Sequence, residues 1–272
     1  MKKVLKIIGC VLLIGALWFA NGFFGNPVSK WLAARAANNY LKENFADTAY
    51  EAEQTVYSFK DGKYHTRIVL PGSADSTFTL SFTMGGKLFY STYAVAVLSR
   101  WNTAERLIME YAELTEAVFA AADLPYASEI RFGELRFAWD AQARESAYAI
   151  PAEELELDGI YDIKVLGAQA GELTVYFCDE TVTAERLSEM LLAIRAAFDA
   201  ADVPFRTIDC VLESPLPETG KWNMERMEVM NFPYEEIYAE GLATRVEASN
   251  AAADAYYAEM DEVKKTAEAY PQ

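Results

Sequence analysis

Histidine is nearly absent from this sequence, with His65 as the single example among 272 residues. A zinc site built on two histidines, including the H-E-x-x-H helix, is therefore excluded. Serine or cysteine catalysis with a histidine base would depend on His65 alone, and the sequence contains no G-x-S-x-G nucleophile elbow. It also contains no P-loop and no G-x-G-x-x-G fingerprint. On a predicted strand His65 shares a face with Arg67 and Val69, opposite Tyr64, Thr66 and Ile68. This position favours an exposed strand histidine without a catalytic role.

Cysteine is also scarce, with only Cys10, Cys178 and Cys210. Cys10 belongs to an apolar N-terminal run, and the other two end or interrupt the predicted strands "LTVYFC" and "RTIDCVL". Side chains alternate between the two faces of a strand, so Cys178 points away from the apolar set of its strand, whereas Cys210 shares that set. The two sulfurs then lie on opposite faces. We predict two free thiols and no disulfide.

Positive charge is the third deficit. The chain has 24 Lys+Arg against 41 Asp+Glu, a formal net charge of −17. Without Lys2, Lys3 and Lys6, which precede or begin the first apolar run, the remainder has 21 basic and 41 acidic residues and a net charge of −20. Such a surface repels phosphate backbones and anionic lipid heads. We expect no nucleic-acid partner and an affinity for cations or basic proteins.

An apolar run opens the chain, because no charged residue occurs from Ile7 to Phe24. As a helix these residues would rise about 27 Å, close to the roughly 30 Å hydrocarbon core of a bilayer. The preceding lysines favour a cytoplasmic N-terminus. No A-x-A-like cleavage triplet follows, and the apolar stretch before Cys10 is too short for a lipobox. We predict a single-pass signal-anchor over residues 1–25, held in the cell membrane through residues 7–24, with a cleaved signal peptide or a lipoprotein anchor as alternatives.

The remaining chain predicts an α+β protein of two domains, 26–148 and 149–272, each with an antiparallel sheet. The first domain begins with an amphipathic helix, "VSKWLAARAANNYLKENF", with Trp31, Leu32, Leu41 and Phe45 on one side. A hairpin around Asp61-Gly62 and the alternating strand "TFTLSFTM" follow. A helix is expected from Tyr93 to Ala122, and "EIRFGELRFAW" alternates like one or two strands. Its aromatic residues could also form a binding surface.

The second domain is expected after the weakly patterned stretch 140–159, which predicts the boundary. "GELTVYF", "FRTIDCVLE" and "MERMEVMNF" predict strands, and a helix is expected over 183–201. A long C-terminal helix is predicted from near Tyr234. Its apolar and small residues form a heptad seam, which favours packing on its own or the preceding domain, with self-association or partner binding as the alternative. The seam consists of Leu242, Val246, Ser249, Ala253, Tyr256, Met260 and Val263.

An internal repeat links the two halves. "TAERLIMEYAELTEAVFAAADLPY" begins at Thr103, and "TAERLSEMLLAIRAAFDAADVPF" begins at Thr183. Both threonines are predicted helix N-caps, the following glutamates complement the positive helix end, and the prolines terminate the helices. One residue is lost inside the second copy, which rotates one helix face relative to the other. The repeat is interpreted as scaffold. The alternative is a paired site formed by Arg106/Arg186 or Asp123/Asp202.

Acidic residues concentrate in "PAEELELDG", which contains Glu153, Glu154, Glu156 and Asp158. The order of these residues is not that of an EF-hand loop. A solvated acidic loop is the favoured interpretation. A weak calcium site and a pair of glycosidase-type carboxylates are the alternatives.

Four segments together resemble the YfjL-like family: "NGFFGNPVSKWLA", "RWNTAERL", "ADVPFRTIDCVLE" and "FPYEEIYAEGL". The resemblance spans nearly the whole chain. It implies a membrane-anchored protein of Gram-positive bacteria with an N-terminal and a C-terminal YfjL-like domain, and it supplies no catalytic residues. Residues 28–90 also resemble the PepSY/cystatin arrangement, in which one helix lies on an antiparallel sheet.

These observations predict a binding or regulatory module outside the membrane, not an enzyme. No catalytic, cofactor-binding or metal-binding residue is assigned, and another envelope or membrane protein is the expected partner. Two alternatives stay open. One is a cell-envelope hydrolase that uses carboxylates, and the other is a cation-dependent structural protein of the cell surface.

Overall fold

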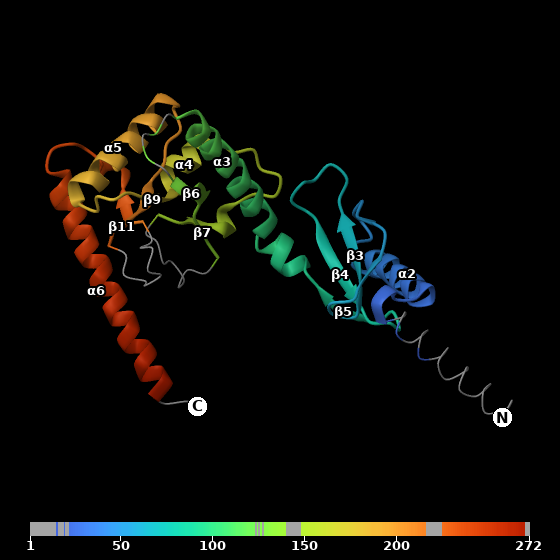
Figure 1. Cartoon of the computed structure of the whole chain (residues 1–272). Coiled ribbons are helices and arrows are strands. Elements are labelled where there is room, and N and C mark those ends of the chain that lie inside the picture. The colour runs from blue at the N-terminus through green and yellow to red at the C-terminus, as the bar shows by residue number, and fades with distance from the viewer. Residues whose placement is uncertain are drawn as a thin grey trace. The chain divides into compact units, whose positions relative to one another are not determined.

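The computed structural model describes most of the chain after residue 21 (Figure 1). The predicted anchor, residues 7–24, lies mostly outside the described part, and no helix within that part is long and apolar enough to cross a membrane. The described residues are 15, 19, 22–122, 124, 126, 128–139, 148–215 and 225–269.

The chain forms two compact units. Unit 1 comprises residues 1–104 and 155–159, and unit 2 comprises 105–154 and 160–272. The first boundary falls inside a helix. Residues 105–148, which the sequence assigned to the N-terminal domain, therefore belong to unit 2.

Unit 1 contains a sheet in which every ladder is antiparallel, as predicted. Its order is β1-β3-β4-β5, and β2 also pairs with β3. The strands are β1 (Glu51–Ala52), β2 (Val56–Ser58), β3 (Lys63–Val69), β4 (Phe78–Phe82) and β5 (Leu88–Ser91).

The hairpin predicted around Asp61-Gly62 is confirmed as β2–β3. Ser58 opposes Lys63 at its closed end, so the loop has four residues, Phe59 to Gly62. Gly62 has a φ of 67°, a left-handed conformation that glycine adopts without steric cost.

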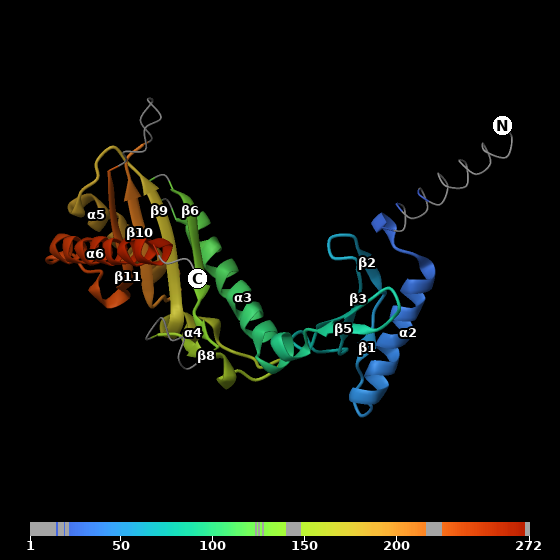
Figure 2. The ribbon, with the colours of Figure 1, turned by 90° about the horizontal axis from the view of Figure 1, so that it is seen from below.

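Helix α2 (Pro27–Asn44) packs on one face of this sheet, against β1 and β3 (Figure 2). Asn26 caps it by accepting a hydrogen bond from the Ser29 amide at 2.7 Å. The predicted apolar side is wrong in part, because Trp31 is 57% exposed and lies beside Arg35. The helix instead buries small residues at four-residue spacing, which lets its backbone approach the sheet closely. These residues are Ser29, Ala33 and Ala37, followed by Leu41.

The helix expected from Tyr93 to Ala122 is divided. A π-helical turn, η1 (Ala94–Leu98), precedes α3 (Trp101–Ala121), and Arg100 between them has a φ of 67°. A left-handed non-glycine residue costs roughly 1–2 kcal/mol. Its guanidinium offsets that cost by donating to the Leu155 and Val97 carbonyls, each at 3.0 Å. Thr103 consequently lies inside α3 and is not an N-cap. Its buried hydroxyl has no hydrogen-bond partner within the described structure.

Unit 2 contains a four-stranded sheet of order β11-β10-β9-β6. Its strands are β6 (Ser128–Leu135), β9 (Gly171–Cys178), β10 (Thr207–Glu213) and β11 (Arg226–Pro233). The outer two ladders are antiparallel as expected, but β9 and β10 are parallel. Helix α5 (Ala184–Ala200) makes the crossover that a parallel pair requires.

Four smaller elements complete this part of unit 2. Strands β7 (Phe137–Ala138) and β8 (Ile150–Pro151) form a parallel pair, and η2 (Ala152–Glu154) follows. Helix α4 (Ile163–Ala170), which the sequence pattern did not reveal, is capped by the Asp162 side chain. It has only eight residues, too few to show a clear helical period.

The second copy of the repeat folds as predicted. Thr183 is the N-cap of α5, accepting from the Arg186 amide at 3.2 Å. Phe119 of α3 and Phe198 of α5, which occupy equivalent repeat positions, meet edge to face with centroids 5.0 Å apart. The predicted apolar face of α5 is buried throughout: Leu187, Met190, Leu191, Ile194 and Phe198.

The two thiols also follow the strand parity. Cys210 is buried among the core residues, Cys178 is exposed, and neither forms a disulfide. The prediction of two free thiols is therefore confirmed.

The C-terminal helix begins later than expected. A short turn, η3 (Tyr234–Glu236), comes first, and α6 (Leu242–Ala269) starts after Gly241, whose φ is 66°. Arg245 holds this turn by donating to three backbone carbonyls of residues 236–240. The first half of the seam packs on β11 and α5 (Figure 1), whereas Tyr256, Met260 and Val263 are exposed. Packing on its own domain is therefore confirmed for the first half alone.

Candidate functional site

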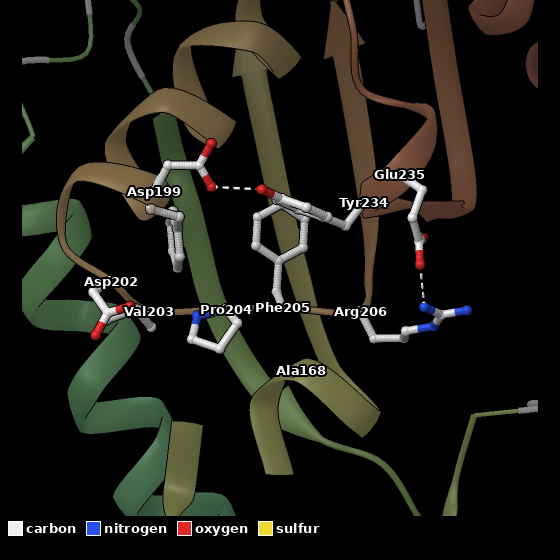
Figure 3. A pocket seen from close by; sticks show the side chains of 10 residues that line it. Ala168, Asp199, Asp202, Val203, Pro204, Phe205, Arg206, Tyr234 and Glu235 are labelled. Atoms are coloured by element: carbon white, nitrogen blue, oxygen red, sulfur yellow. Dashed lines mark hydrogen bonds and ion pairs between the residues drawn. The ribbon is translucent and has the colours of Figure 1, made fainter. Parts of the chain in front are cut away.

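A pocket of about 470 Å³ opens in unit 2 where α5 leads into β10 (Figure 3). This volume lies in the range of small-ligand pockets, roughly 300–1,000 Å³. The end of α4 and the turn η3 close its sides. Its lining residues are Ala168, Phe198, Asp199, Asp202, Val203, Pro204, Phe205, Arg206, Tyr234 and Glu235.

Three aromatic rings form the apolar part of the pocket. Phe198 meets Phe205 with centroids 5.5 Å apart, and Phe205 meets Tyr234 at 5.2 Å, both edge to face. Edge-to-face contacts add roughly 0.5–1.5 kcal/mol each beyond the area that they bury. Phe198 and Phe205 are buried, whereas Tyr234 is half-buried and presents its ring to the pocket (Figure 3).

The loop between α5 and β10 is held from several directions. Asp202 has a φ of 53°, which turns the chain out of α5. The buried Tyr111 hydroxyl donates to the Pro204 carbonyl at 2.9 Å, and burial raises the pKa of Tyr111. The Arg206 amide donates to the Gly171 carbonyl at 2.7 Å. These bonds connect the pocket loop to α3 and β9, so the loop is a fixed part of the scaffold.

The Tyr234 hydroxyl is engaged at the upper rim. It donates to Asp199 at 2.7 Å, as drawn in Figure 3, and this hydrogen bond, more than burial, raises the pKa of Tyr234. The Arg195 guanidinium lies 4.3 Å from the centre of the Tyr234 ring and 3.6 Å from the Asp199 carboxylate. Tyr234 is thereby fixed by an acid on one side and a cation on its face.

Two further ion pairs complete the rim. Lys164 bonds Asp202 at 2.8 Å, and this hydrogen bond lowers the pKa of the Asp202 carboxyl. Arg206 pairs with Glu235, and its guanidinium lies 4.3 Å from the centre of the Tyr148 ring. Each rim acid thus has a basic partner. Exposed pairs of this kind contribute roughly 0–1 kcal/mol, so a ligand carrying charges can exchange with them at low cost.

A second cavity of about 320 Å³ adjoins the first. It is lined by Tyr148, Ala149, Ala168, Gln169 and Arg206, and it shares Ala168 and Arg206 with the larger pocket. Ala168 and Arg206 therefore line both cavities.

The single histidine belongs to β3 of unit 1 and is not among the pocket residues. His65 is half-buried, not exposed as expected: its Nδ1 lies 2.8 Å from the Ser81 hydroxyl and its Nε2 lies 3.0 Å from Asp61. Ser81 is buried beneath it. His65 therefore joins a strand to its hairpin loop.

The two arginines of the paired site considered for the repeat each bond a different acid. Arg106 bonds Glu110 at 3.0 Å, whereas Arg186 bonds Asp179 at 2.7 Å. Asp202 lines the pocket, and Asp123 lies outside the described residues.

Sheet register separates the strands that follow the two copies of the repeat. β6 begins at Ser128 opposite Phe177, whereas β10 begins at Thr207 opposite Glu172. The two strands therefore begin at opposite ends of β9, about 17 Å apart at strand spacing.

The four acidic residues near residue 155 are exposed, as expected for a solvated loop, and Asp158 also makes backbone hydrogen bonds. Asp158 accepts hydrogen bonds from the amides of Ala74 and Asp75, at 2.8 and 3.1 Å, and Asp75 accepts one from the Asp158 amide at 2.9 Å. The other three are Glu153, Glu154 and Glu156. Within the described ranges no three His, Cys, Asp or Glu residues converge as metal ligands.

A half-buried carboxyl lies elsewhere, on β10. Burial raises the pKa of Asp209, and the nearby Glu172 adds to the shift. Glu172 is itself buried and bound by Arg136 through two nitrogens. Asp209 is not among the pocket residues.

Composition and residue spacing did not reveal the pocket, but the segments that carry the family resemblance contain part of its lining. Two of the four segments that carry the family resemblance, "ADVPFRTIDCVLE" and "FPYEEIYAEGL", supply Phe205, Arg206, Tyr234 and Glu235. Segments almost 30 residues apart in sequence thus meet at one place.

Family models match both halves of the chain. Residues 1–92 match the YfjL-like N-terminal domain, and residues 110–247 match the YfjL-like C-terminal domain. The chain belongs to the YfjL-like family. All residues of the pocket fall inside the YfjL-like C-terminal domain.

The other comparisons add little. None of the curated proteins matches the chain. Among solved structures, the chain is similar to a DUF5037 family protein from Ruminococcus gnavus, at 14% identity over 66% of this chain and 74% of that one. The TM-score is 0.19, too low to support an argument about the fold.

Proposed function

We propose that this protein is a membrane-anchored, extracytoplasmic binding module, and that the unit 2 pocket receives an apolar side chain of a partner protein. The observation that carries the proposal is the aromatic pocket with its rim of paired charges. An apolar side chain would pack on Phe205 and Tyr234. Charged residues next to it in the partner would exchange with the rim pairs, which supports specificity more than affinity.

The proposed location rests on the sequence. Residues 7–24 carry no charge and have the length of a membrane span, and Lys2, Lys3 and Lys6 precede them. In this arrangement both units lie outside the membrane, where the predicted partner is another envelope or membrane protein. A native protein found entirely in the soluble cytoplasmic fraction would refute this part of the proposal.

Site-specific photo-crosslinking tests the pocket. A photoreactive amino acid at Glu235, on the exposed rim, is expected to form a distinct adduct in the native membrane. Ala168→Trp, which fills the pocket from an exposed wall position, should abolish that adduct while leaving the core intact. Ala252→Trp, on the exposed side of α6, is the matched control and should preserve it. Persistence of the adduct in Ala168→Trp would refute binding in the pocket.

A carboxylate hydrolase is the second candidate function, and Asp209 is the observation that favours it. Its pKa is raised by burial, as a general acid requires. However, Asp209 lies outside the pocket, and the neighbouring Glu172 is held by Arg136. Hydrolysis of a cell-wall polymer by the purified chain, lost in Asp209→Asn, would reverse the order of the two candidates.

The cation-dependent alternative has less support. Asp158 is committed to backbone amides of residues 74 and 75, which leaves the acidic stretch without its best-placed ligand. We expect calcium to leave the melting temperature unchanged, because a ligand that does not bind the folded state does not stabilise it.

A further inference from the structure

Positive charge is unevenly distributed along this acidic chain. The first acidic residue is Glu43, and six basic residues precede it: Lys2, Lys3, Lys6, Lys30, Arg35 and Lys42. Lys2, Lys3 and Lys6 precede the predicted anchor and would lie on its cytoplasmic side, and Lys42 lies in the last turn of α2, so Lys30 and Arg35 are the basic residues of α2 nearest the anchor. The average surface repels an anionic bilayer, whereas this first part of α2 carries only basic charge.

The fold brings further lysines to the same place. The closed end of the β2–β3 hairpin carries Lys60, and the β4–β5 turn carries Lys87. Because β3 and β4 are antiparallel and Tyr64 opposes Phe82, both connections lie at one end of the sheet. A Cβ at Gly86 would lie 3.1 Å from Leu32, so the β4–β5 turn also adjoins the first turns of α2. Figure 2 shows the β2–β3 hairpin on the side of unit 1 where α2 starts.

Exposed aromatic residues gather with these lysines. Phe23, Phe24 and Phe59 are 51%, 83% and 63% exposed. Phe23 and Phe59 stack on each other with centroids 6.2 Å apart, although one precedes α2 and the other occupies the hairpin loop. Large exposed aromatics beside lysines are typical of surfaces at a membrane–water interface. We call this surface the aromatic end: Phe23, Phe24, Phe59, Lys30, Lys60 and Lys87.

Hydrogen bonds connect residues 22 and 26, at the end of the predicted anchor, to unit 1 beside the aromatic end. The Tyr57 hydroxyl donates to the Gly22 carbonyl at 2.8 Å, and the Asn26 amide donates to the Tyr64 hydroxyl at 2.8 Å. Gly25 between them has a φ of 68°. An anchor that ends at Phe24 therefore continues into unit 1 through a fixed turn, which places the aromatic end against the bilayer surface.

We infer that the aromatic end docks on an anionic bilayer surface, with Phe59 inserted at the headgroup level and the lysines beside the lipid phosphates. The inference rests on the proposed membrane anchor and goes beyond it, because an anchor alone leaves the orientation of unit 1 free. Docking fixes that orientation and directs the opposite end of the sheet, including Ala49, away from the lipid. Seven residues of β3 separate the two ends, about 20 Å at strand spacing, whereas interfacial insertion reaches only about 5–10 Å.

Fluorescence quenching in vesicles tests this orientation. The full-length chain carries an environment-sensitive label at Phe59→Cys, in a background of Cys10→Ser and Cys178→Ser, because Cys210 is buried. It is reconstituted into phosphatidylcholine vesicles with or without phosphatidylglycerol, and brominated lipids act as quenchers. We expect quenching by roughly twofold or more at position 59 and almost none for the matched label at Ala49→Cys.

Charge variants test the lipid specificity. Each lysine near an anionic surface strengthens binding by about fivefold, so Lys60→Gln with Lys87→Gln should weaken docking by about 30-fold and abolish the quenching. Lys42→Gln, exposed at the far end of α2, is the matched control and should have no effect.

Equal quenching at positions 59 and 49 in chains that float with the vesicles would overturn the docking while leaving the anchor intact. The docking would also be overturned if quenching at position 59 were the same with and without phosphatidylglycerol and the same in the lysine variants. Failure of the full-length chain to float with any vesicle would instead refute the membrane anchor, and the docking with it.

Discussion

Replacing Tyr111 with phenylalanine removes one hydroxyl from the interior of unit 2 and one hydrogen bond from the pocket loop. The Tyr111 side chain is fully buried, and its hydroxyl donates to the Pro204 carbonyl at 2.9 Å. The ring itself packs the same way in the variant. The experiment therefore isolates the hydrogen bond that connects α3 to the pocket.

The expected loss follows from the surroundings of the two atoms. A buried acceptor left without its donor costs about 1–3 kcal/mol. Pro204 is half-buried, so water can reach its carbonyl in part, and we expect the lower part of that range, about 1–2 kcal/mol. Because 1.4 kcal/mol corresponds to a factor of ten, amide exchange through opening of unit 2 should accelerate by about 5- to 30-fold.

Hydrogen exchange followed by mass spectrometry resolves the two units in the full-length chain. Peptides from β9 and β10 should exchange faster in Tyr111→Phe, whereas peptides from β3 and β4 of unit 1 should not change. Tyr256→Phe, at an exposed position of α6, is the matched control and should shift stability by less than about 0.5 kcal/mol. Equal exchange in Tyr111→Phe and wild type, or equal acceleration in both units, would refute the reasoning.

Three further predictions concern individual side chains. Thr183→Ala removes the α5 cap and should cost about 0.5–2 kcal/mol in urea unfolding, whereas Thr103→Val should be neutral or stabilising because that buried hydroxyl has no partner within the described structure. Equal losses at the two repeat positions would contradict this. In native protein, Cys178 should react with a thiol reagent and Cys210 should not, because Cys210 is buried and burial raises its pKa; comparable labelling of both by mass spectrometry would be the contrary result. Asp209→Asn should stabilise the fold at neutral pH, and the gain should disappear in acid, because a raised pKa means that folded protein binds the proton more tightly than unfolded chain and gains stability as pH falls through that pKa. Unfolding midpoints measured across pH test this, and a gain that persists in acid would count against it.

Local patterns in the sequence predicted much of the fold. The alternation in "TFTLSFTM" became β4, the turn residues near Asp61 became a hairpin loop, and the parity of Cys178 and Cys210 matched their burial. The apolar face of α5 was also correct. These predictions succeeded because side-chain period and turn chemistry act within a few residues.

Predictions failed where distant groups decide the outcome. The break at Arg100 depends on a carbonyl 55 residues away, and the late start of α6 depends on the turn that Arg245 holds. Thr103 and Thr183 share the same following residues, but only Thr183 is a cap, because Arg100 moves the helix start in the first copy. The parallel β9–β10 ladder could not be predicted from the strand patterns, because the residues of a single strand do not indicate the direction of its neighbour.

The sequence alone determined the α+β class, the two YfjL-like halves and the free thiols, and its single histidine excludes a zinc site built on two histidines. The tertiary structure decided which side chains from distant segments come together. Residues from α4, α5, the loop before β10 and η3 form the pocket only because the strand ends meet there. In the same way, antiparallel pairing places the turns that carry Lys60 and Lys87 at one end of the unit 1 sheet, where Phe59 stacks on Phe23. Such convergence depends on distances between residues far apart in sequence, and no local pattern encodes it.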